Sequence, residues 1–318
     1  MSTATADVSK RKAWVMAARP QTLPAGAAPV VVGVGLAVHA GVAAPLPAVA
    51  ALVGALLLQV GTNFANDYYD AVKGADTDER EGFTRVTAGG LIEPAEVKRA
   101  MIGTYALALV VGSYLVAVGG VPIVVVGLSG IAAGVLYTGG PLPYGYRGLG
   151  DLFVFVYFGL VAVTGTYYVQ AVASMESVGL FPTTLPAGSV PLAAVVASLP
   201  AAGLSTAILV GNNIRDRETD AAAGKKTLVV YLGYGWSRVE YLALVGMAYV
   251  VPVVFALEPA YGLAALAPLL SLPLAVAVSR TLLTRTDGEA LNPALERVGQ
   301  TLFLHSLLFA VGLGIAGL

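Results

Sequence analysis

Long hydrophobic runs alternate with short polar segments along the whole chain. Nine runs approach the roughly 20 apolar residues that a helix needs to cross a bilayer: 21–39, 44–64, 98–118, 121–138, 152–173, 190–211, 239–257, 260–279 and 299–317. Two of the boundaries rest on Gly119-Gly120 and on Glu258-Pro259. The pattern predicts an all-α fold, a polytopic bundle of nine transmembrane helices.

Composition supports a membrane protein. Hydrophobic residues make up 57% of the 318 residues and charged residues 12%, whereas soluble domains average about 45–50% and 25%. The chain contains no cysteine, which excludes disulfides, thiol chemistry and cysteine-ligated metals. We expect the chain to lie in the lipid bilayer and to bind no nucleic acid.

The distribution of charge predicts an orientation. With nine spans, all 18 Lys and Arg residues fall on the side of the N-terminus or at its membrane edge, and the opposite loops carry only Glu176 and Glu258. The positive-inside rule makes the side of the N-terminus cytoplasmic. We therefore expect residues 1–18 to form a cytoplasmic tail without a signal peptide. Residues 19–318 would form a single transmembrane domain in the plasma membrane.

Two acidic clusters lie where inward-running spans end: N-F-A-N-D-Y-Y-D at 63–70 and N-N-I-R-D-R-E-T-D at 212–220. Asn66 and Asp70 are four residues apart, and Asn212, Asp216 and Asp220 repeat that spacing, so each set shares one face of a helix. Carboxylates at the negative end of a helix dipole near a membrane are unfavourable unless a cation compensates them.

The two faces therefore predict an oxygen-rich site for Mg²⁺ and a diphosphate. Basic residues follow each cluster and suit a bound diphosphate: Lys73, Arg80 and Arg85 after the first, Lys225 and Lys226 after the second. Asp67 and Asn213 lie beside the main faces and would bind the metal or support its ligands. The other acids of the clusters fit ordinary solvated loop charges: Asp76, Asp78, Glu79, Glu81 and Glu218.

These motifs resemble the UbiA superfamily of intramembrane prenyltransferases. N-D-Y-Y-D before a charged loop and D-R-E-T-D before A-G-K-K-T-L are similar to its paired aspartate motifs. The predicted nine transmembrane helices also match the number in this superfamily. Three stretches resemble the branch that acts on 1,4-dihydroxy-2-naphthoate in menaquinone biosynthesis: A-A-R-P-Q-T-L-P-A at 17–25, N-D-Y-Y-D-A-V-K-G-A-D at 66–76 and T-G-G-P-L-P-Y-G-Y-R-G-L-G-D at 138–151. The resemblance covers nearly the whole chain from Arg19. It departs at Gly74, where the generic first motif has a third Asp; here the acid comes at Asp76.

The resemblance implies Mg²⁺-dependent transfer of a polyprenyl group from an allylic diphosphate to dihydroxynaphthoate. Loss of CO₂ and diphosphate would give demethylmenaquinol. The implied metal-binding residues are Asn66, Asp67, Asp70, Asn212, Asp216 and Asp220, with catalysis assigned to Asn66, Asp70, Asp216 and Asp220. The implied substrate-binding residues are Lys73, Lys225, Lys226, Arg19, Arg147, Tyr144 and Tyr146.

Other interpretations of these residues stay open. Arg19 and Arg147 also fit positive-inside anchoring, and Tyr144 and Tyr146 fit the aromatic belt of a membrane interface. Within the superfamily, the acceptor could instead be hydroxybenzoate, homogentisate, a glyceryl lipid or haem. A cation-coupled secondary transporter is a different class of function. Its carboxylates are expected at mid-membrane, whereas these lie at span ends.

Overall fold

The computed structural model describes residues 8–74, 82 and 85–317. The described residues contain helices and connecting segments but no strand, which confirms the all-α prediction. The α-helices are α1 (Lys10–Ala18), α2 (Leu23–His39), α3 (Pro45–Val72), α4 (Pro94–Leu136), α5 (Gly150–Phe155), α6 (Ala162–Ala173), α7 (Leu192–Ala222), α8 (Leu228–Leu257), α9 (Leu272–Thr284) and α10 (Gly288–Ala316). Three short 3₁₀ segments are η1 (Pro20–Thr22), η2 (Tyr144–Arg147) and η4 (Leu263–Ser271), and a π-helical segment, η3 (Val156–Val161), joins α5 to α6.

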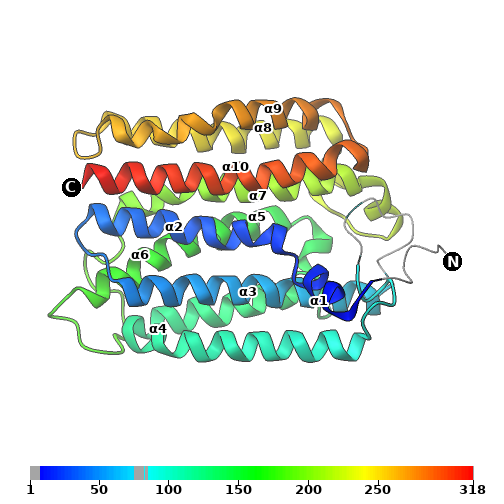
Figure 1. Ribbon diagram of the computed structural model, residues 1–318, viewed down its shortest axis with the longest axis horizontal. Coiled ribbons are helices and arrows are strands. Elements are labelled where there is room, and N and C mark those ends of the chain that lie inside the picture. Colours follow the sequence, from blue (N-terminus) through cyan, green and yellow to red (C-terminus); the bar gives the residue numbers. More distant parts are fainter. Residues whose placement is uncertain (1–7, 75–81, 83–84, 318) are drawn as a thin grey trace.

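The long helices run side by side as one elongated bundle, with the connecting segments gathered at its two ends (Figure 1). Eight helical segments of the described chain are long and apolar enough to cross a membrane: Lys10–His39, Pro45–Val72, Pro94–Leu136, Gly150–Ala173, Leu192–Ala222, Leu228–Leu257, Leu263–Thr284 and Gly288–Ala316. The chain is therefore a multi-pass membrane protein.

Helix α4 covers two of the spans predicted from the sequence. Its backbone leaves helical geometry at Gly120, where φ is 62° and ψ is −147°. The Tyr105 hydroxyl lies 3.3 Å from the Thr62 hydroxyl, and a side chain placed on Gly134 would collide with both groups. Tyr105 and Gly134 would be ~44 Å apart along an unbroken helix. The two halves of α4 therefore fold back on each other at the Gly119-Gly120 boundary.

The helices that carry the acidic clusters are longer than their hydrophobic spans. The spans were predicted to end at 64 and 211, but α3 continues to Val72 and α7 to Ala222. Both clusters are therefore helical, as their four-residue spacing predicted. Hydropathy marks where apolar surroundings end, whereas a helix continues for as long as its backbone hydrogen bonds are made.

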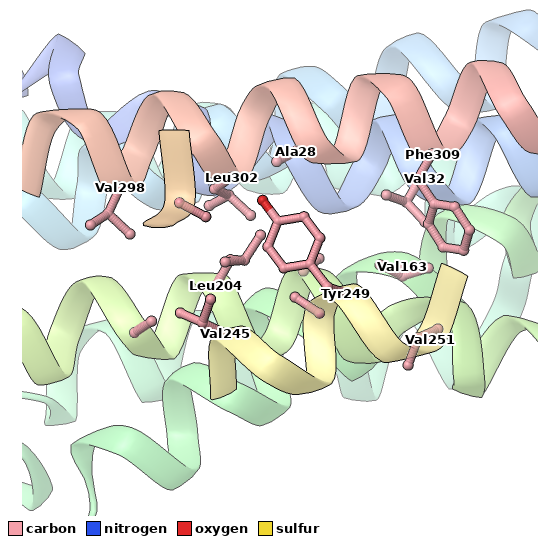
Figure 2. Close-up of a cluster of buried hydrophobic side chains, with 14 of the residues drawn as sticks. Ala28, Val32, Val163, Leu204, Val245, Tyr249, Val251, Val298, Leu302 and Phe309 are labelled. Carbon is pink, nitrogen blue, oxygen red and sulfur yellow. The ribbon is translucent and has the colours of Figure 1, made fainter. Parts of the chain in front are cut away.

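A dense core fills one side of the bundle, between α2, α7, α8 and α10 (Figure 2). Leu204, Leu302 and Phe309 are fully buried there, and Gly35 of α2 packs directly against the backbone of Ala310 of α10. Such close contact between small residues is what holds helices together in lipid, where apolar burial by itself gives little driving force. This packed side is the rigid support for the neighbouring half of the bundle, which is hollow.

Candidate active site

The hollow half of the bundle contains a cavity of about 750 Å³. That volume lies within the roughly 300–1,000 Å³ of ordinary ligand pockets. Residues of α2, α3, α4, α5, α6, α7 and α10 line it. The lining is polar at the ends of α3 and α7 where the acidic clusters lie. Toward the opposite end of the bundle it becomes aliphatic and glycine-rich, with residues such as Ala51, Gly54, Val116 and Val126.

The first acidic face belongs to the last two turns of α3. Asp70 lines the cavity and is 1% exposed. Its Oδ1 accepts a hydrogen bond of 2.5 Å from the Tyr146 hydroxyl, and its Oδ2 accepts one of 3.1 Å from Arg85. Asn66, one turn earlier, also lines the cavity, and its Oδ1 accepts from the Thr138 hydroxyl at 3.0 Å. Both predicted residues thus reach the cavity, held by donors from other segments.

Asp67 has different surroundings from its neighbours. Its Oδ2 accepts from the backbone N–H of Thr87 at 3.1 Å and from the Thr87 hydroxyl at 2.5 Å. Its Oδ1 lies 3.7 Å from a guanidinium nitrogen of Arg19. Arg19 lines the cavity and has a left-handed backbone, with φ 52°. Asp67 therefore ties α3 to the 85–92 segment and to Arg19, and Arg19 rather than Asp67 faces the cavity.

The second acidic face belongs to the end of α7. Asn212, Asp216 and Asp220 all line the cavity. Both oxygens of Asp216 accept hydrogen bonds of 2.7 Å from Arg215, through Nε and Nη2. The Nη1 of Arg215 also donates to Asn292 of α10 at 2.8 Å. This bidentate pair neutralises Asp216 and fixes its orientation.

A single ammonium group joins the two faces. The Nζ of Lys225 lies 4.0 Å from Asp70 and 3.8 Å from Asp220, and 4.8 Å from the centre of the Tyr146 ring. Carboxylates from α3 and α7 therefore lie on either side of one positive charge. The structure brings the two sequence clusters together at this point.

The 137–149 segment closes the polar end of the cavity. Tyr144 and Tyr146 line it, and the Tyr144 hydroxyl donates to the carbonyl of Ala133 at 2.8 Å. Burial raises the pKa of Tyr144, so its phenol stays protonated and remains a donor. The backbone N–H of Lys226 donates to the carbonyl of Tyr146 at 2.9 Å. The segment is thus fastened to the loop that follows α7.

Three of the predicted substrate-binding cations lie outside the lining of the cavity. Lys73, Arg147 and Lys226 have exposed side chains. The Nζ of Lys73 donates to the carbonyl of Thr138 at 2.5 Å and lies 5.3 Å from the centre of the Tyr146 ring. Partial burial of the ammonium group lowers the pKa of Lys73, and the charge of Asp70 partly offsets this effect. These residues surround the polar end from outside, and Asp76 lies outside the described residues.

The donor set fits a hard cation bound together with an anion. Within residues 8–74, 82 and 85–317, no three His, Asp or Glu side chains converge closely enough to bind a metal by themselves. Mg²⁺ needs only one or two protein carboxylates, because it completes its shell with water and substrate phosphate oxygens. The position between Asp70 and Asp220 already attracts a positive charge, that of Lys225. The residues present therefore fit Mg²⁺.

Comparison with known proteins places this arrangement in a family. Residues 27–308 match the model of the UbiA prenyltransferase family. The chain belongs to this family. It is 39% identical over 312 residues to 1,4-dihydroxy-2-naphthoate octaprenyltransferase of Escherichia coli, covering 96% of each chain. It is 38% identical over 305 residues to the protein of that name from Mycobacterium tuberculosis, covering 96% of this chain and 98% of the other.

Solved structures of UbiA homologues share the fold. The apo structure of a homologue from Aeropyrum pernix K1 aligns with a TM-score of 0.65 at 16% identity, covering 92% of this chain and 96% of the other. A homologue from Archaeoglobus fulgidus bound to GPP and Mg²⁺ aligns with a TM-score of 0.58 at 16% identity, covering 94% and 100%. The UbiA architecture is therefore common to chains that differ at most of their positions.

The sequence patterns missed one residue of this cavity and undervalued another. Arg215 lines the cavity and binds Asp216, yet the sequence assigned it no role of its own beside the D-R-E-T-D motif. Arg85 was noted as a charge near the first motif, and in the structure it donates to Asp70. The sequence does show a basic residue next to or near each acidic motif. That proximity along the chain does not predict which carboxylate the basic side chain contacts.

Proposed function

We propose that this chain transfers a polyprenyl group from an allylic polyprenyl diphosphate to 1,4-dihydroxy-2-naphthoate, as a step of menaquinone biosynthesis. CO₂ and diphosphate leave, and demethylmenaquinol forms. The curated relatives with this activity in their names match nearly the full chain. The observation that carries the proposal is the cavity, in which two acidic faces meet at one end of an apolar chamber. Such a cavity suits a donor with an anionic head and an apolar tail.

The acidic faces would hold the head of the donor. Asn66, Asp70, Asn212, Asp216 and Asp220 supply the oxygen ligands, and Asp67 supports the first face through Thr87. Mg²⁺ bound there would stabilise the negative charge that develops on the leaving diphosphate. Lys225 lies between the faces and would bind the phosphate oxygens. Lys73 and Lys226 would add positive charge from outside the cavity.

The apolar chamber would hold the tail and protect the reacting carbon from water. When the C–O bond to diphosphate breaks, the allylic carbon becomes electron-poor and would be captured by any nearby water. The aromatic acceptor instead forms the new C–C bond at the carbon bearing its carboxylate. The bond to CO₂ then breaks, and its electron pair restores the aromatic ring, so a strong base is not required.

Aromatic and basic side chains at the polar end would orient the acceptor. The rings of Tyr144 and Tyr146 line the cavity and can stabilise positive charge through their π-faces. Arg19 is the cationic side chain beside Asp67 that faces the cavity, and it would bind the acceptor carboxylate or a phosphate. Arg147, which is exposed, would act at the entrance.

The membrane arrangement belongs to the proposal as well. Helix α4 spans 43 residues, about twice the roughly 20 that one crossing needs, and its halves run in opposite directions. We count it as two crossings, which gives nine among the described residues, and we treat residues 19–318 as a single domain. The excess of Lys and Arg then assigns the N-terminal tail and the acidic faces to the cytoplasm.

Membranes containing the protein provide the test. They would be incubated with a radiolabelled polyprenyl diphosphate and a panel of acceptors: dihydroxynaphthoate, hydroxybenzoate, homogentisate, a glyceryl lipid and haem. The expected product has the mass of a decarboxylated prenyl naphthalenediol, and it should disappear in excess EDTA and return with Mg²⁺. A product from another acceptor, with none from dihydroxynaphthoate, would replace the proposed function by that activity.

Substitutions test the acidic faces in the same assay. Asp70→Asn and Asp216→Asn should each abolish transfer, because each removes a carboxylate from the lining of the cavity. Glu218→Gln is the matched control, since Glu218 lies on the same helix but is exposed and pairs with Arg217. Transfer that survives both Asp variants, or excess EDTA, would contradict the metal assignment.

A further inference from the structure

Four glycines of the cavity lining leave open space beside their backbones: Gly165 of α6, and three that belong to α3 and α4. Gly54 of α3 and Gly112 and Gly127 of the two halves of α4 all line the cavity. A Cβ added at any of the three would meet no atom within 4 Å. The missing side chains therefore add to the width of the cavity.

Packing does not account for these three positions. A helical glycine costs roughly 1 kcal/mol relative to alanine, and membrane helices usually use it to bring two backbones close together. Gly61 is of that kind, because a Cβ there would lie 2.7 Å from the Tyr105 ring. Gly54, Gly112 and Gly127 have no such neighbour. Their lack of side chains therefore keeps a passage open through the cavity.

The three glycines lie at one level of the bundle. The Thr62 and Tyr105 hydroxyls are 3.3 Å apart, and Gly134 packs against both. Gly112 is seven residues from Tyr105, Gly127 is seven from Gly134, and Gly54 is eight from Thr62, all in the direction away from the acidic faces. At 1.5 Å per residue each glycine is ~10–12 Å beyond this contact. We call the three the glycine ring.

The distance from the acidic face to the glycine ring can be compared with the length of a polyprenyl tail. Gly54 and Asp70 are sixteen residues apart on α3, which is ~24 Å. An isoprene unit contributes four chain bonds of about 1.5 Å and advances roughly 5 Å when extended. About four or five units therefore fit between the diphosphate site and the ring. Eight units, the number in the names of the curated relatives, measure ~40 Å and extend beyond it.

We propose that the glycine ring selects the length of the polyprenyl donor, by leaving room for the tail beyond about its fifth isoprene unit to continue through the cavity. This inference rests on the proposed function, because it concerns the tail of the same donor. A bulky side chain at Gly54, Gly112 or Gly127 would block the passage at this level and leave the diphosphate end unchanged.

The test compares two donors in each variant, with dihydroxynaphthoate as the acceptor. Geranyl diphosphate has two isoprene units and ends before the ring, whereas octaprenyl diphosphate has eight. Gly54→Leu, Gly112→Leu and Gly127→Leu should each lower the kcat/KM ratio of octaprenyl to geranyl donor by at least ~10-fold. Gly54→Ala should lower the ratio less than Gly54→Leu, since the methyl group fills less of the passage.

Gly103→Leu is the matched control. Gly103 lies on the same half of α4 as Gly112, also has open space beside it, and is exposed without lining the cavity. Its donor ratio should equal that of the unmodified protein. Variants of the ring that keep this ratio would overturn the inference and show that the tail leaves the cavity before the ring. Variants that lose both donors equally would overturn it too, because the effect would then not depend on the length of the tail. If the unmodified protein used neither donor, the proposed function itself would fail.

Discussion

Replacing Arg215 with glutamine is expected to destabilise the protein by about 3 kcal/mol. The side chains of Arg215 and Asp216 are 2% and 10% exposed and share two hydrogen bonds of 2.7 Å. Removing one partner of a buried ion pair costs about 3–5 kcal/mol, because the remaining charge loses its main compensation. The lower end applies here, since Asp216 lines the cavity and water can reach it.

The same variant should respond more strongly to Mg²⁺ than the unmodified protein. With Arg215 present, the metal shares Asp216 with a guanidinium that occupies both oxygens. Without it, Mg²⁺ supplies the missing positive charge. At a metal concentration about 100 times the Kd, the stabilisation is ~2.7 kcal/mol, which would restore most of the loss.

The assay is unfolding of the purified protein in detergent, followed with EDTA and with saturating MgCl₂. Arg217→Gln is the control, because this arginine is two residues away and pairs with Glu218, which is 73% exposed. An exposed pair contributes about 0–1 kcal/mol, so the control should unfold like the unmodified protein. An Arg215→Gln variant that matches the control in EDTA would refute the stabilising pair. An equal Mg²⁺ response in all three proteins would refute competition for Asp216.

Three further predictions concern single positions. Tyr146→Phe removes a hydrogen-bond donor to the buried Asp70. A hydrogen bond to a charged group is worth about 1.5–3 kcal/mol, so kcat/KM for prenyl transfer should fall ~10- to 100-fold. An unchanged kcat/KM would show that this hydrogen bond does not assist transfer. Gly35→Ala places a methyl group against the backbone of Ala310 and should lower the thermal unfolding midpoint. Gly246→Ala is the control and should leave the midpoint unchanged, because a methyl group there meets nothing within 4 Å. Equal midpoints would argue against close packing of α2 and α10. Partial burial lowers the pKa of Lys73, so this lysine loses its charge at a lower pH than a free lysine does. Lys73→Arg should therefore move the alkaline loss of kcat/KM to higher pH. Superimposable pH profiles would show that the charge of Lys73 does not assist transfer.

The sequence by itself was sufficient for the features that depend on local periodicity. Runs of apolar residues predicted membrane-spanning helices, and the break at Gly119-Gly120 predicted the reversal within α4. The four-residue spacing of Asn66 with Asp70, and of Asp216 with Asp220, predicted faces that the structure turns toward one cavity. These predictions succeed because a helix places residues i and i+4 on one face regardless of its neighbours. The hydrophobic spans ended at 64 and 211, short of the helix ends at Val72 and Ala222, since hydropathy does not report backbone hydrogen bonding.

Only the tertiary structure determined which basic side chains pair with which carboxylates. Arg215 pairs with the adjacent Asp216, and Lys225 lies between carboxylates of two helices. Arg147 and Lys226, equally basic in the sequence, remain exposed. The glycine ring likewise exists only because α3 and the folded halves of α4 bring Gly54, Gly112 and Gly127 to one level. Periodicity acts within a single helix, whereas these contacts depend on how separate helices pack, and packing is determined by the shapes of all the side chains between them.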